Sequence, residues 1–530
     1  MAQSSLGHLP LAVALPVAEL AQSMGLPTDQ LLFVVFLLVC IPLGWLWCLV
    51  PGQFAKHTVS LALGFIVVYG MIGWGVLHLL ITSLIAYFMV ENFLPSGKNK
   101  SPEERKKDVV IANKIGTAVF VFSMGYLCVS HIYRQITDYL GYSMDFTAPQ
   151  MVATLKFVSY AWSRVDGEAM NAGESLGEHE RENAYRAERA MRERPSLLKY
   201  LAWMFFFPAV FAGPYTDYTE YERRVSGEAF KQYGLNDAPF PFRPALQKLF
   251  YALCCYPGII IAGKFPIFGY VNSDAFYENT SVWYRIGYVT LFVGLVRWKY
   301  YFAWYLAEAG CIASGLGLSK YDPKTKQAEW EGVTNCHALR CETSCSVKDI
   351  TTHWNIRTSE WLKHYVYFRV SSPAFIRKIM SHSAWANICT KFTSAFWHGF
   401  YPGYYLFFLQ IAAVQLFEAP LRAVVSIYLS PESLPFKVFM CLYTMGSFAW
   451  LGASFVILEF GPSIRLFADS YFFYHIIGAI LCFGVFPIIL KIHKKGDKKK
   501  KADEVPNGQV STKPEDQKVE SKGLTKPKAQ

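Results

Sequence analysis

The sequence is poor in charged residues, and most of them lie in a few short segments. Asp, Glu, Lys and Arg make up 17% of the 530 residues, whereas a typical soluble domain has about 25%. Residues 93–108 hold 8 of these charges, residues 163–194 hold 14 and residues 491–530 hold 18. Hydrophobic residues make up 53%, and the mean hydropathy is +0.21. The composition excludes a single soluble domain, a disordered chain and a collagen-like chain, and it predicts a multi-spanning membrane protein.

Features of several other protein classes are also missing. Residues 1–30 contain no Lys or Arg, so they lack the positive start of a cleavable signal peptide. There is no internal repeat, and the 12 Cys are scattered, which excludes a small disulfide framework. The net charge of +11 does not indicate nucleic-acid binding, because residues 491–530 alone contain 12 Lys against 6 acidic residues. Basic flanks of membrane helices lie on the cytosolic side, so we predict membrane lipids and no nucleic acid as partners.

Uncharged stretches predict the membrane-spanning helices. Residues 31–50 have the length that a bilayer core requires, about 20 residues. Residues 58–90 are uncharged for 33 residues, and Gly70, Gly73 and Gly75 predict a break into two helices. The further apolar segments are residues 109–129, 151–162, 197–211, 246–270, 282–307, 392–417, 438–458 and 471–490. We therefore expect an all-α polytopic membrane protein with roughly 9–11 transmembrane helices.

Several apolar segments contain a basic residue, for example Lys156, Arg285 and Arg297. Ionisable groups at membrane depth are costly and usually face the protein interior or a water-filled cavity. This pattern predicts helices arranged around an internal chamber. The charged residues 163–194 are expected to form a solvated loop or helix.

The chain divides into three parts by composition. Residues 1–30 form an N-terminal segment that we expect on the non-cytosolic side, and residues 31–490 form the multi-spanning domain. Residues 491–530 form a Lys-rich tail that we expect to be disordered and cytosolic, because its composition cannot supply a packed core.

One candidate for chemistry is His398, the only group in residues 392–417 that titrates near neutral pH. A lone His in an apolar helix is more often a hydrogen-bonded core residue than a catalyst. Here Gly399 and Gly403 permit close backbone approach, and Pro402 frees a backbone carbonyl, which is tolerated beside a cavity. A neutral His in such a site could accept the proton of a hydroxyl group.

The second candidate lies within residues 342–369, where aromatic side chains recur at helical spacing. Trp354, Thr358, Trp361, Tyr365 and Phe368 would share one helix face at steps of 4, 3, 4 and 3. Such a stripe is typical of an amphipathic helix on a membrane or against other helices. Asn355 adjoins it, and its amide could donate to a carbonyl oxygen or hold a substrate.

Together the two segments resemble the membrane-bound O-acyltransferase (MBOAT) family, in particular its lysophospholipid acyltransferase branch and the broad-specificity fungal enzymes. One motif of that branch reads Glu, eleven residues, Trp-Asn, two residues, Thr, two residues, Trp. It is filled here by Glu342, Trp354, Asn355, Thr358 and Trp361. A second motif reads Trp-His-Gly, three residues, Gly-Tyr. It is filled here by Trp397, His398, Gly399, Gly403 and Tyr404. The resemblance covers roughly residues 30–490.

The resemblance implies a multi-pass enzyme of the endoplasmic reticulum membrane that transfers a fatty acyl chain from acyl-CoA to the hydroxyl of a lysophospholipid. It implies His398 and Asn355 as the catalytic pair, with the other motif residues as substrate-binding or supporting groups. It implies no cofactor, since acyl-CoA is a co-substrate. Sterol, diacylglycerol and protein acceptors within the family remain alternatives, and so does a proton-coupled transporter that uses His398 as a relay.

Other residue clusters give weaker indications. Cys336, His337, Cys341 and Cys345 do not have the spacing of paired zinc-binding units, so we predict no metal site. Cys389 has only Lys391 nearby to lower its pKa, which argues against a Cys nucleophile.

Overall fold

The computed structural model describes residues 8–9, 11–95, 101–141, 143–177, 180–235, 238–265 and 267–503, and these residues are mainly helical. Within them the only strands are β1 (Lys320–Asp322) and β2 (Gln327–Glu329), which pair antiparallel as a short hairpin. The predicted all-α fold is therefore confirmed.

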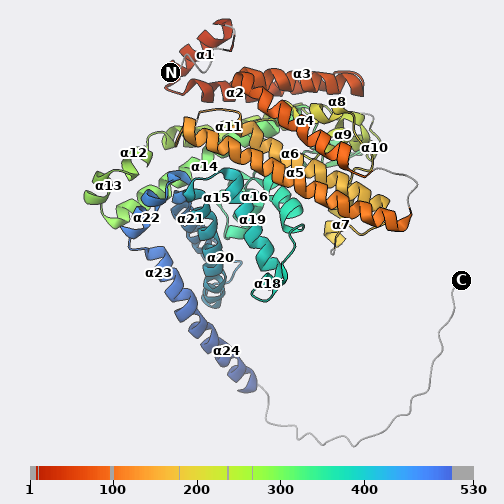
Figure 1. The fold of residues 1–530 in the computed structure, drawn as a ribbon. Helices are drawn as coiled ribbons and strands as arrows, with labels where there is room; N and C mark the ends of the chain where they lie inside the picture. The colour runs from red at the N-terminus through yellow and green to blue at the C-terminus, as the bar shows by residue number, and fades with distance from the viewer. Residues whose placement is uncertain are drawn as a thin grey trace, which may run out of the picture.

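The N-terminal part of the chain forms one side of the molecule, shown in red and orange in Figure 1. Its helices are α1 (Leu11–Met24), α2 (Thr28–Cys48), α3 (Gln53–Ile72), α4 (Val76–Phe93), α5 (Pro102–Thr137) and α6 (Thr147–Asn171). A 3₁₀ turn, Gly73–Gly75, separates α3 from α4, so the predicted break at the glycines is confirmed. Helix α5 packs along α6, and α2 packs against the later helix α14 (Val282–Ala313).

The middle of the chain consists of short helices and two long ones. They are α7 (Glu180–Arg189), α8 (Leu197–Met204), α9 (Tyr218–Ser226), α10 (Glu228–Lys231), α11 (Phe242–Ala262), α12 (Ile267–Val271) and α13 (Asp274–Glu278), followed by α14. Helix α14 is central to the fold, because it contacts α11, α2 and α21 (Leu434–Ile457).

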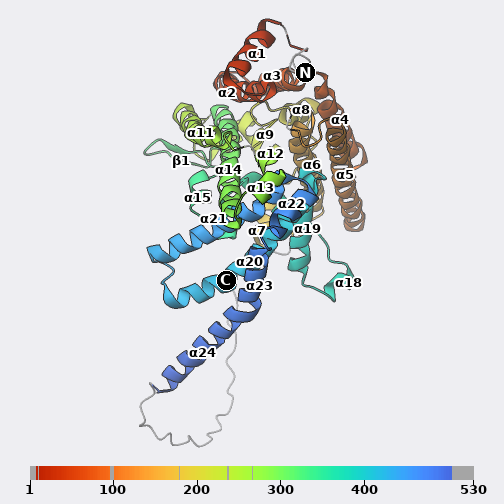
Figure 2. The ribbon, with the colours of Figure 1, turned by 90° about the vertical axis from the view of Figure 1, so that its left-hand side faces the viewer.

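The C-terminal part begins with short helices and continues with long ones. They are α15 (Ala338–Glu342), α16 (Val347–His353), α17 (Ile356–Leu362), a π-helical turn (Lys363–Tyr367), α18 (Ala374–Arg377), α19 (His382–His398), α20 (Pro402–Tyr428), α21, α22 (Phe460–Ala468), α23 (Phe473–Ala479), a second π-helical turn (Ile480–Val485) and α24 (Phe486–Asp503). Helices α23 and α24 project away from the body of the molecule (Figures 1 and 2).

Among the described residues, seven segments are long and apolar enough to cross a membrane. They are Thr28–Cys48, Gln53–Phe93, Glu103–Thr137, Phe242–Ala262, Pro402–Tyr428, Leu434–Ile457 and Phe473–Lys495. The second of these contains both α3 and α4, and the long helices α6 and α14 lie outside the seven. The protein is thus a polytopic membrane protein.

Of the basic residues in apolar segments, Lys156, Arg285 and Arg297 are buried, as the sequence predicted, whereas Lys264 and Lys299 are exposed. Lys156 on α6 is fully buried, and its Nζ donates to the carbonyl oxygens of Trp203 (2.8 Å) and Met204 (3.3 Å). Arg297 on α14 is buried and pairs with Glu342 at 2.7 Å. Each of these two buried cations therefore has polar partners inside the protein, which offsets the cost of removing it from water.

The prediction of a solvated segment over residues 163–194 is wrong for its first part and for single residues of α7, whereas residues 173–175 and 192–194 are exposed. Helix α6 continues through the first nine residues of the segment, and Asp166 is buried between Arg186 (2.7 Å) and Arg369 (2.6 Å). Arg189 of α7 pairs with the buried Asp217 at 2.7 Å. Charge alone suggested exposure, but the partners come from distant segments that the local pattern could not reveal.

Asp217 connects this ionic network to the later motif. It accepts hydrogen bonds from Tyr365 (2.7 Å) and Tyr215, beside the pair with Arg189. Burial raises the pKa of this carboxyl group, yet Arg189 and the tyrosine hydrogen bonds hold the pKa below its usual value. The charged form of Asp217 is therefore favoured, and it fixes the π-helical turn after α17 against α9.

The Lys-rich tail begins as a helix. Helix α24 extends to Asp503, since Lys is a good helix former and the helix is already started by the apolar residues before it. Residues 504–530, where the rest of the predicted disordered tail lies, are outside the described residues.

Candidate active site

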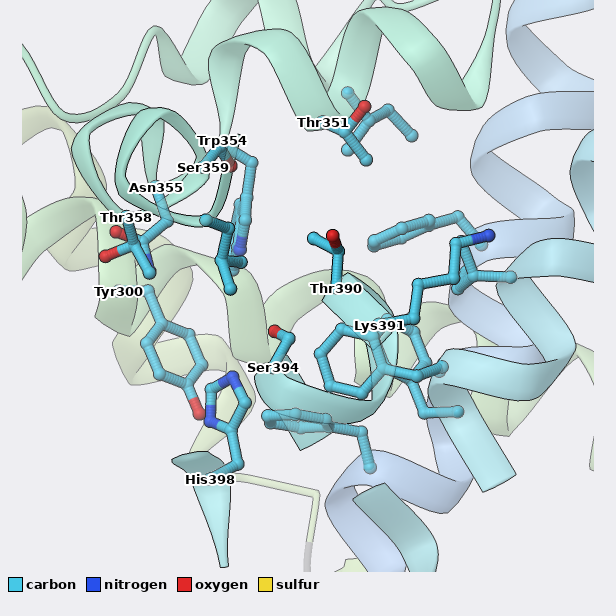
Figure 3. A pocket seen from close by; sticks show the side chains of 18 of the residues that line it. Tyr300, Thr351, Trp354, Asn355, Thr358, Ser359, Thr390, Lys391, Ser394 and His398 are labelled. Carbon is cyan, nitrogen blue, oxygen red and sulfur yellow. The ribbon is translucent and has the colours of Figure 1, made fainter. Parts of the chain in front are cut away.

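A cavity of about 670 Å³ lies in the C-terminal half of the protein. Its walls come from α14, α16, α17, α19, α20 and α21, and its size suits a small-molecule or lipid substrate. Figure 3 shows the side chains of Tyr300, Asn355, Thr358 and His398 on one side of this cavity and that of Lys391 on the other. The two candidate residues, 43 positions apart in the sequence, therefore face the same space.

His398 is the last residue of α19, and its half-buried ring is held by aromatic packing. Its ring centroid lies 5.0 Å from that of Phe455, 5.6 Å from that of Tyr404 and 4.9 Å from that of Trp397. Within the described residues, its ring nitrogens have no hydrogen-bond partner, although they are accessible from the cavity. The core-histidine alternative required such a partner, so the geometry favours a histidine that is available to a substrate.

Helix α19 ends at His398, and the next residue adopts a non-helical conformation that glycine tolerates. Gly399 has φ +124°, and a Cβ atom added there would lie 3.1 Å from Nδ1 of His131. Pro402 then occupies the first turn of α20, where its fixed φ is favourable. The apolar block 392–417 is thus not one continuous helix, and the break places His398 at a helix end beside the cavity.

Gly403 allows α20 and α21 to approach each other closely. Its N–H donates to the carbonyl oxygen of Leu458 at 2.7 Å, and an added Cβ would lie 2.1 Å from the carbonyl oxygen of Ser454. Tyr404 packs on Phe455 of α21, at 4.8 Å between ring centroids. The glycine of the second motif therefore brings the aromatic residues around His398 together.

Trp397 anchors the end of α19 from the other side. Its indole N–H donates to the carbonyl oxygen of Met151 at 3.0 Å, and its own carbonyl oxygen lies 3.0 Å from Nε2 of His131. His131 is buried against the second motif. No local signal in the sequence linked it to a segment 266 residues away.

Asn355 is the residue that precedes α17, and it adopts a left-handed conformation with φ 46° and ψ 52°. Asn tolerates this region better than most residues. Its side chain lines the cavity, and its amide has no hydrogen-bond partner in the described part of the chain. Both the donor and the acceptor of the amide are therefore free to bind a substrate.

Glu342 supports the wall behind Asn355. Arg297 forms a bidentate pair with its carboxylate (2.8 and 2.7 Å), and the hydroxyl group of Tyr301 donates to it at 2.8 Å. Trp354 packs on Tyr301 (5.3 Å between ring centroids) and on Trp304 (4.9 Å). Glu342 lies outside the cavity wall, so its part in the first motif is to fix α14 beneath Trp354.

The predicted aromatic stripe on one helix face is wrong. Trp354 and Thr358 line the cavity, whereas Trp361 points away from it and donates to the carbonyl oxygen of Leu155 at 2.9 Å. Tyr365 also points away and binds Asp217. The left-handed Asn355 before α17 and the π-helical turn after it change the helical phase, so the regular spacing does not hold.

The cavity wall carries positive charge. Arg297, Lys363 and Lys391 line it, and none of the lining residues described by the structure is Asp or Glu. Arg297 is neutralised by Glu342, whereas Lys391 has the neutral Gln415 as its partner at 3.0 Å. Lys363 contacts the ring of Phe368. The cavity therefore favours a substrate that carries an anionic group.

The cysteine cluster lies elsewhere. Cys336 and Cys341 are buried in an apolar cluster with Tyr301 and Tyr305. Among the described residues no group of three or more His, Cys, Asp or Glu side chains is placed to hold a metal ion.

The fold and the cavity define a polytopic membrane protein with an interior site, in which an imidazole and an amide face one predominantly apolar chamber. The sequence profile described as MBOAT, membrane-bound O-acyltransferase family, matches residues 132–459. The chain belongs to this family and is an acyltransferase.

Curated relatives extend over most of the chain. It is 28% identical over 501 residues to "Lysophospholipid acyltransferase" of Schizosaccharomyces pombe, covering 91% of each chain. It is 31% identical over 507 residues to "Membrane-bound glycerophospholipid O-acyltransferase 2" of Gallus gallus, covering 90% of this chain and 89% of the relative. It is 27% identical over 474 residues to "Lysophospholipid acyltransferase 2" of Arabidopsis thaliana, covering 86% and 93%.

Proposed function

We propose that this acyltransferase esterifies the free hydroxyl group of a lysophospholipid with the acyl chain of acyl-CoA, and that it does so in the endoplasmic reticulum membrane with its C-terminus in the cytosol. The observation that carries the proposal is the single cavity lined by both His398 and Asn355, each with polar atoms available to a substrate. Relatives from a fungus, an animal and a plant, two of which are named lysophospholipid acyltransferases, support the acceptor.

The proposed reaction begins with the acceptor hydroxyl group beside His398. The neutral imidazole accepts the hydroxyl proton as the oxygen attacks the thioester carbonyl carbon. The amide N–H of Asn355 donates to the oxyanion that develops, or to the acceptor oxygen in its attacking position. The carbon–sulfur bond then breaks, and the CoA thiolate leaves and recovers the proton from the imidazolium.

The step as written uses neither a metal ion nor a covalent acyl-enzyme. A thiolate is a good leaving group, because the pKa of a thiol lies near that of free Cys, about 8.5. Acyl-CoA therefore acts as a co-substrate, and no cofactor is proposed.

The charge of the cavity supports substrates that carry phosphate groups. Lys391 and Lys363 line the cavity without a carboxylate partner among the described residues. Both acyl-CoA and a lysophospholipid carry phosphate groups, which such lysines can pair with. A transporter that uses His398 as a relay has no support from the family assignment, which identifies an enzyme.

The acceptor can be tested with purified protein in detergent or vesicles. Radiolabelled acyl-CoA is offered with a panel of lysophospholipids, with diacylglycerol, with cholesterol and with monoacylglycerol. We expect esterified product with lysophospholipids and little with the neutral acceptors. If diacylglycerol or sterol alone gives product, the proposed acceptor is wrong. If none of the acceptors gives product, acyl-CoA is not the donor.

A further inference from the structure

The start of α17 has an unusual capping arrangement. An Asn that precedes a helix normally accepts a hydrogen bond from the second or third helical N–H with its own side chain. Here the side chain of Asn355 makes no such bond. The first two N–H groups are instead taken by Asn335: the N–H of Ile356 donates to its carbonyl oxygen (2.8 Å) and the N–H of Arg357 to its Oδ1 (3.1 Å).

Because Asn335 makes these contacts, the Asn355 side chain is not needed to cap α17. With its N–H groups already satisfied, α17 has no need of the Asn355 amide, which can therefore face the cavity. The same contacts hold Asn355 in its left-handed conformation, because strained backbone persists only where the surroundings fix it. Asn335 is 2% exposed and lies outside the cavity wall, so it does not contact a substrate.

Asn335 is fixed in turn by Glu308 of α14. The N–H groups of Asn335 (2.8 Å) and Cys336 (3.1 Å) both donate to Oε1 of Glu308. The other carboxylate oxygen pairs with Nζ of Lys248 on α11 at 2.7 Å. Glu308 is completely buried, and Lys248 also donates to Thr334 at 3.2 Å. A buried carboxylate with this many partners fixes the backbone of residues 335–336 in place.

We infer that Asn335 is a positioning residue for Asn355, and that Glu308, neutralised by Lys248, holds Asn335 in place for this purpose. The inference rests on the proposed role of Asn355 in the reaction. Without the oxygen atom of the Asn335 side chain, the N–H of Arg357 loses its acceptor. The Asn355 side chain directly precedes α17 and can then accept this hydrogen bond, and in doing so it leaves the cavity.

The direct test removes the capping oxygen with Asn335→Ala in two backgrounds, the natural sequence and Asn355→Ala. In the natural background we expect kcat to fall by about 10²-fold, the cost of a displaced catalytic group, while KM for both substrates changes by less than about threefold. In the Asn355→Ala background we expect no further loss of kcat, because the residue that Asn335 positions is already absent. Asn335→Asp keeps an acceptor oxygen, so its kcat should be closer to that of the natural protein than to that of Asn335→Ala.

Two outcomes would overturn the inference. One is an equal fold-loss from Asn335→Ala in both backgrounds, which would mean that Asn335 supports the fold or substrate binding. The other is normal kcat for Asn335→Ala in the natural background. Full activity of Asn355→Ala alone would instead contradict the proposed role of Asn355 in the reaction. Failure of the inference and failure of the proposed function therefore give different results. Asn113→Ala on the exposed face of α5 is a matched control, expected to leave kcat unchanged.

A second pair of variants covers the case in which Asn335→Ala does not fold. Glu308→Gln with Lys248→Met removes both buried charges but keeps an oxygen acceptor for the two N–H groups, whereas Glu308→Leu with Lys248→Met removes the acceptor as well. We expect higher kcat from the Gln pair than from the Leu pair, and no such difference in the Asn355→Ala background. Equal kcat for the two pairs in the natural background would overturn the role of Glu308.

Discussion

His398 differs from the histidines of serine-hydrolase triads in how it is oriented. In a triad a carboxylate fixes the ring through a hydrogen bond. Here aromatic rings, among them those of Trp397, Tyr404 and Phe455, fix it, and no acidic residue is among the described residues of the cavity wall. An imidazole without a carboxylate beside it stays neutral more easily in an apolar cavity. That is the form that a general base requires.

Replacing His398 by Ala is expected to lower acyl transfer by roughly 10²–10⁴-fold, the usual contribution of a general base. His398→Gln retains a polar side chain of similar size but cannot accept a proton near neutral pH, so it should be no more active than the Ala variant. The measurement is the initial rate of ester formation by purified, folded protein. His382→Gln at the other end of α19 is the control, and a fully active His398→Gln enzyme would exclude a general base at this position.

Lys391 is expected to bind a substrate phosphate. Lys391→Gln should raise KM for the phosphate-bearing substrate that it contacts by roughly 10–100-fold, since a charge-assisted hydrogen bond contributes about 1.5–3 kcal/mol. Separate titrations of acyl-CoA and of lysophospholipid identify which substrate it is. Lys437→Gln, which breaks a surface pair with Glu432 away from the cavity, serves as the control. Unchanged KM for both substrates would remove Lys391 from substrate binding.

At the scale of helices, the sequence predicts what depends on local pattern. The glycines at the end of α3 divide one long uncharged stretch into two helices, as expected, because a run of 33 residues exceeds a bilayer. The burial of Arg297 also follows from its place in an apolar segment. These features need only the composition of a single stretch of chain.

Features that depend on distant partners could not be predicted. Asp166 lies in a segment that was predicted to be solvated, and its burial depends on Arg369, far away in the sequence. The buried Asp217 likewise depends on Arg189 of another helix. The aromatic spacing around Trp361 suggested one regular helix. Instead, a hydrogen bond to Asn335 fixes the left-handed residue before α17, and a hydrogen bond from Tyr365 to Asp217 fixes the π-helical turn after it. The candidate residues themselves were found by motif, whereas their common cavity required the fold.

Packing of α20 on α21 depends on Gly403. Gly403→Ala would place a Cβ atom 2.1 Å from the carbonyl oxygen of Ser454, so the helices must separate. We expect a loss of about 1–3 kcal/mol of stability from overpacking, seen as a lower Tm, together with reduced activity as Tyr404 and Phe455 move from His398. Gly446→Ala on α21, where an added Cβ meets nothing within 4 Å, is the matched control. Equal Tm values for the two variants would contradict this close approach.

At the scale of the whole molecule, the last segment of the chain is expected to be dispensable for catalysis. Residues 504–530 contain no Trp, Tyr, Phe, Ile or Met, so they have little to add to a packed core. Removing them should leave specific activity within about threefold, because chain termini usually tolerate change. Protease should also cleave this segment from the outside of sealed microsomes if it is cytosolic. An inactive truncated enzyme would contradict the claim that the segment is dispensable. Protection of the segment from protease would contradict its cytosolic location.

The central claim is that the fold brings two distant motifs into one catalytic site. Its most direct test is the rate of acyl transfer by His398→Ala, Asn355→Ala and the double variant, compared with the natural protein. Residues that act on one transition state are strongly non-additive. We therefore predict that the double variant is nearly as active as the less active single variant. Fold-losses that multiply would show that the two residues act independently, and the shared site would be wrong.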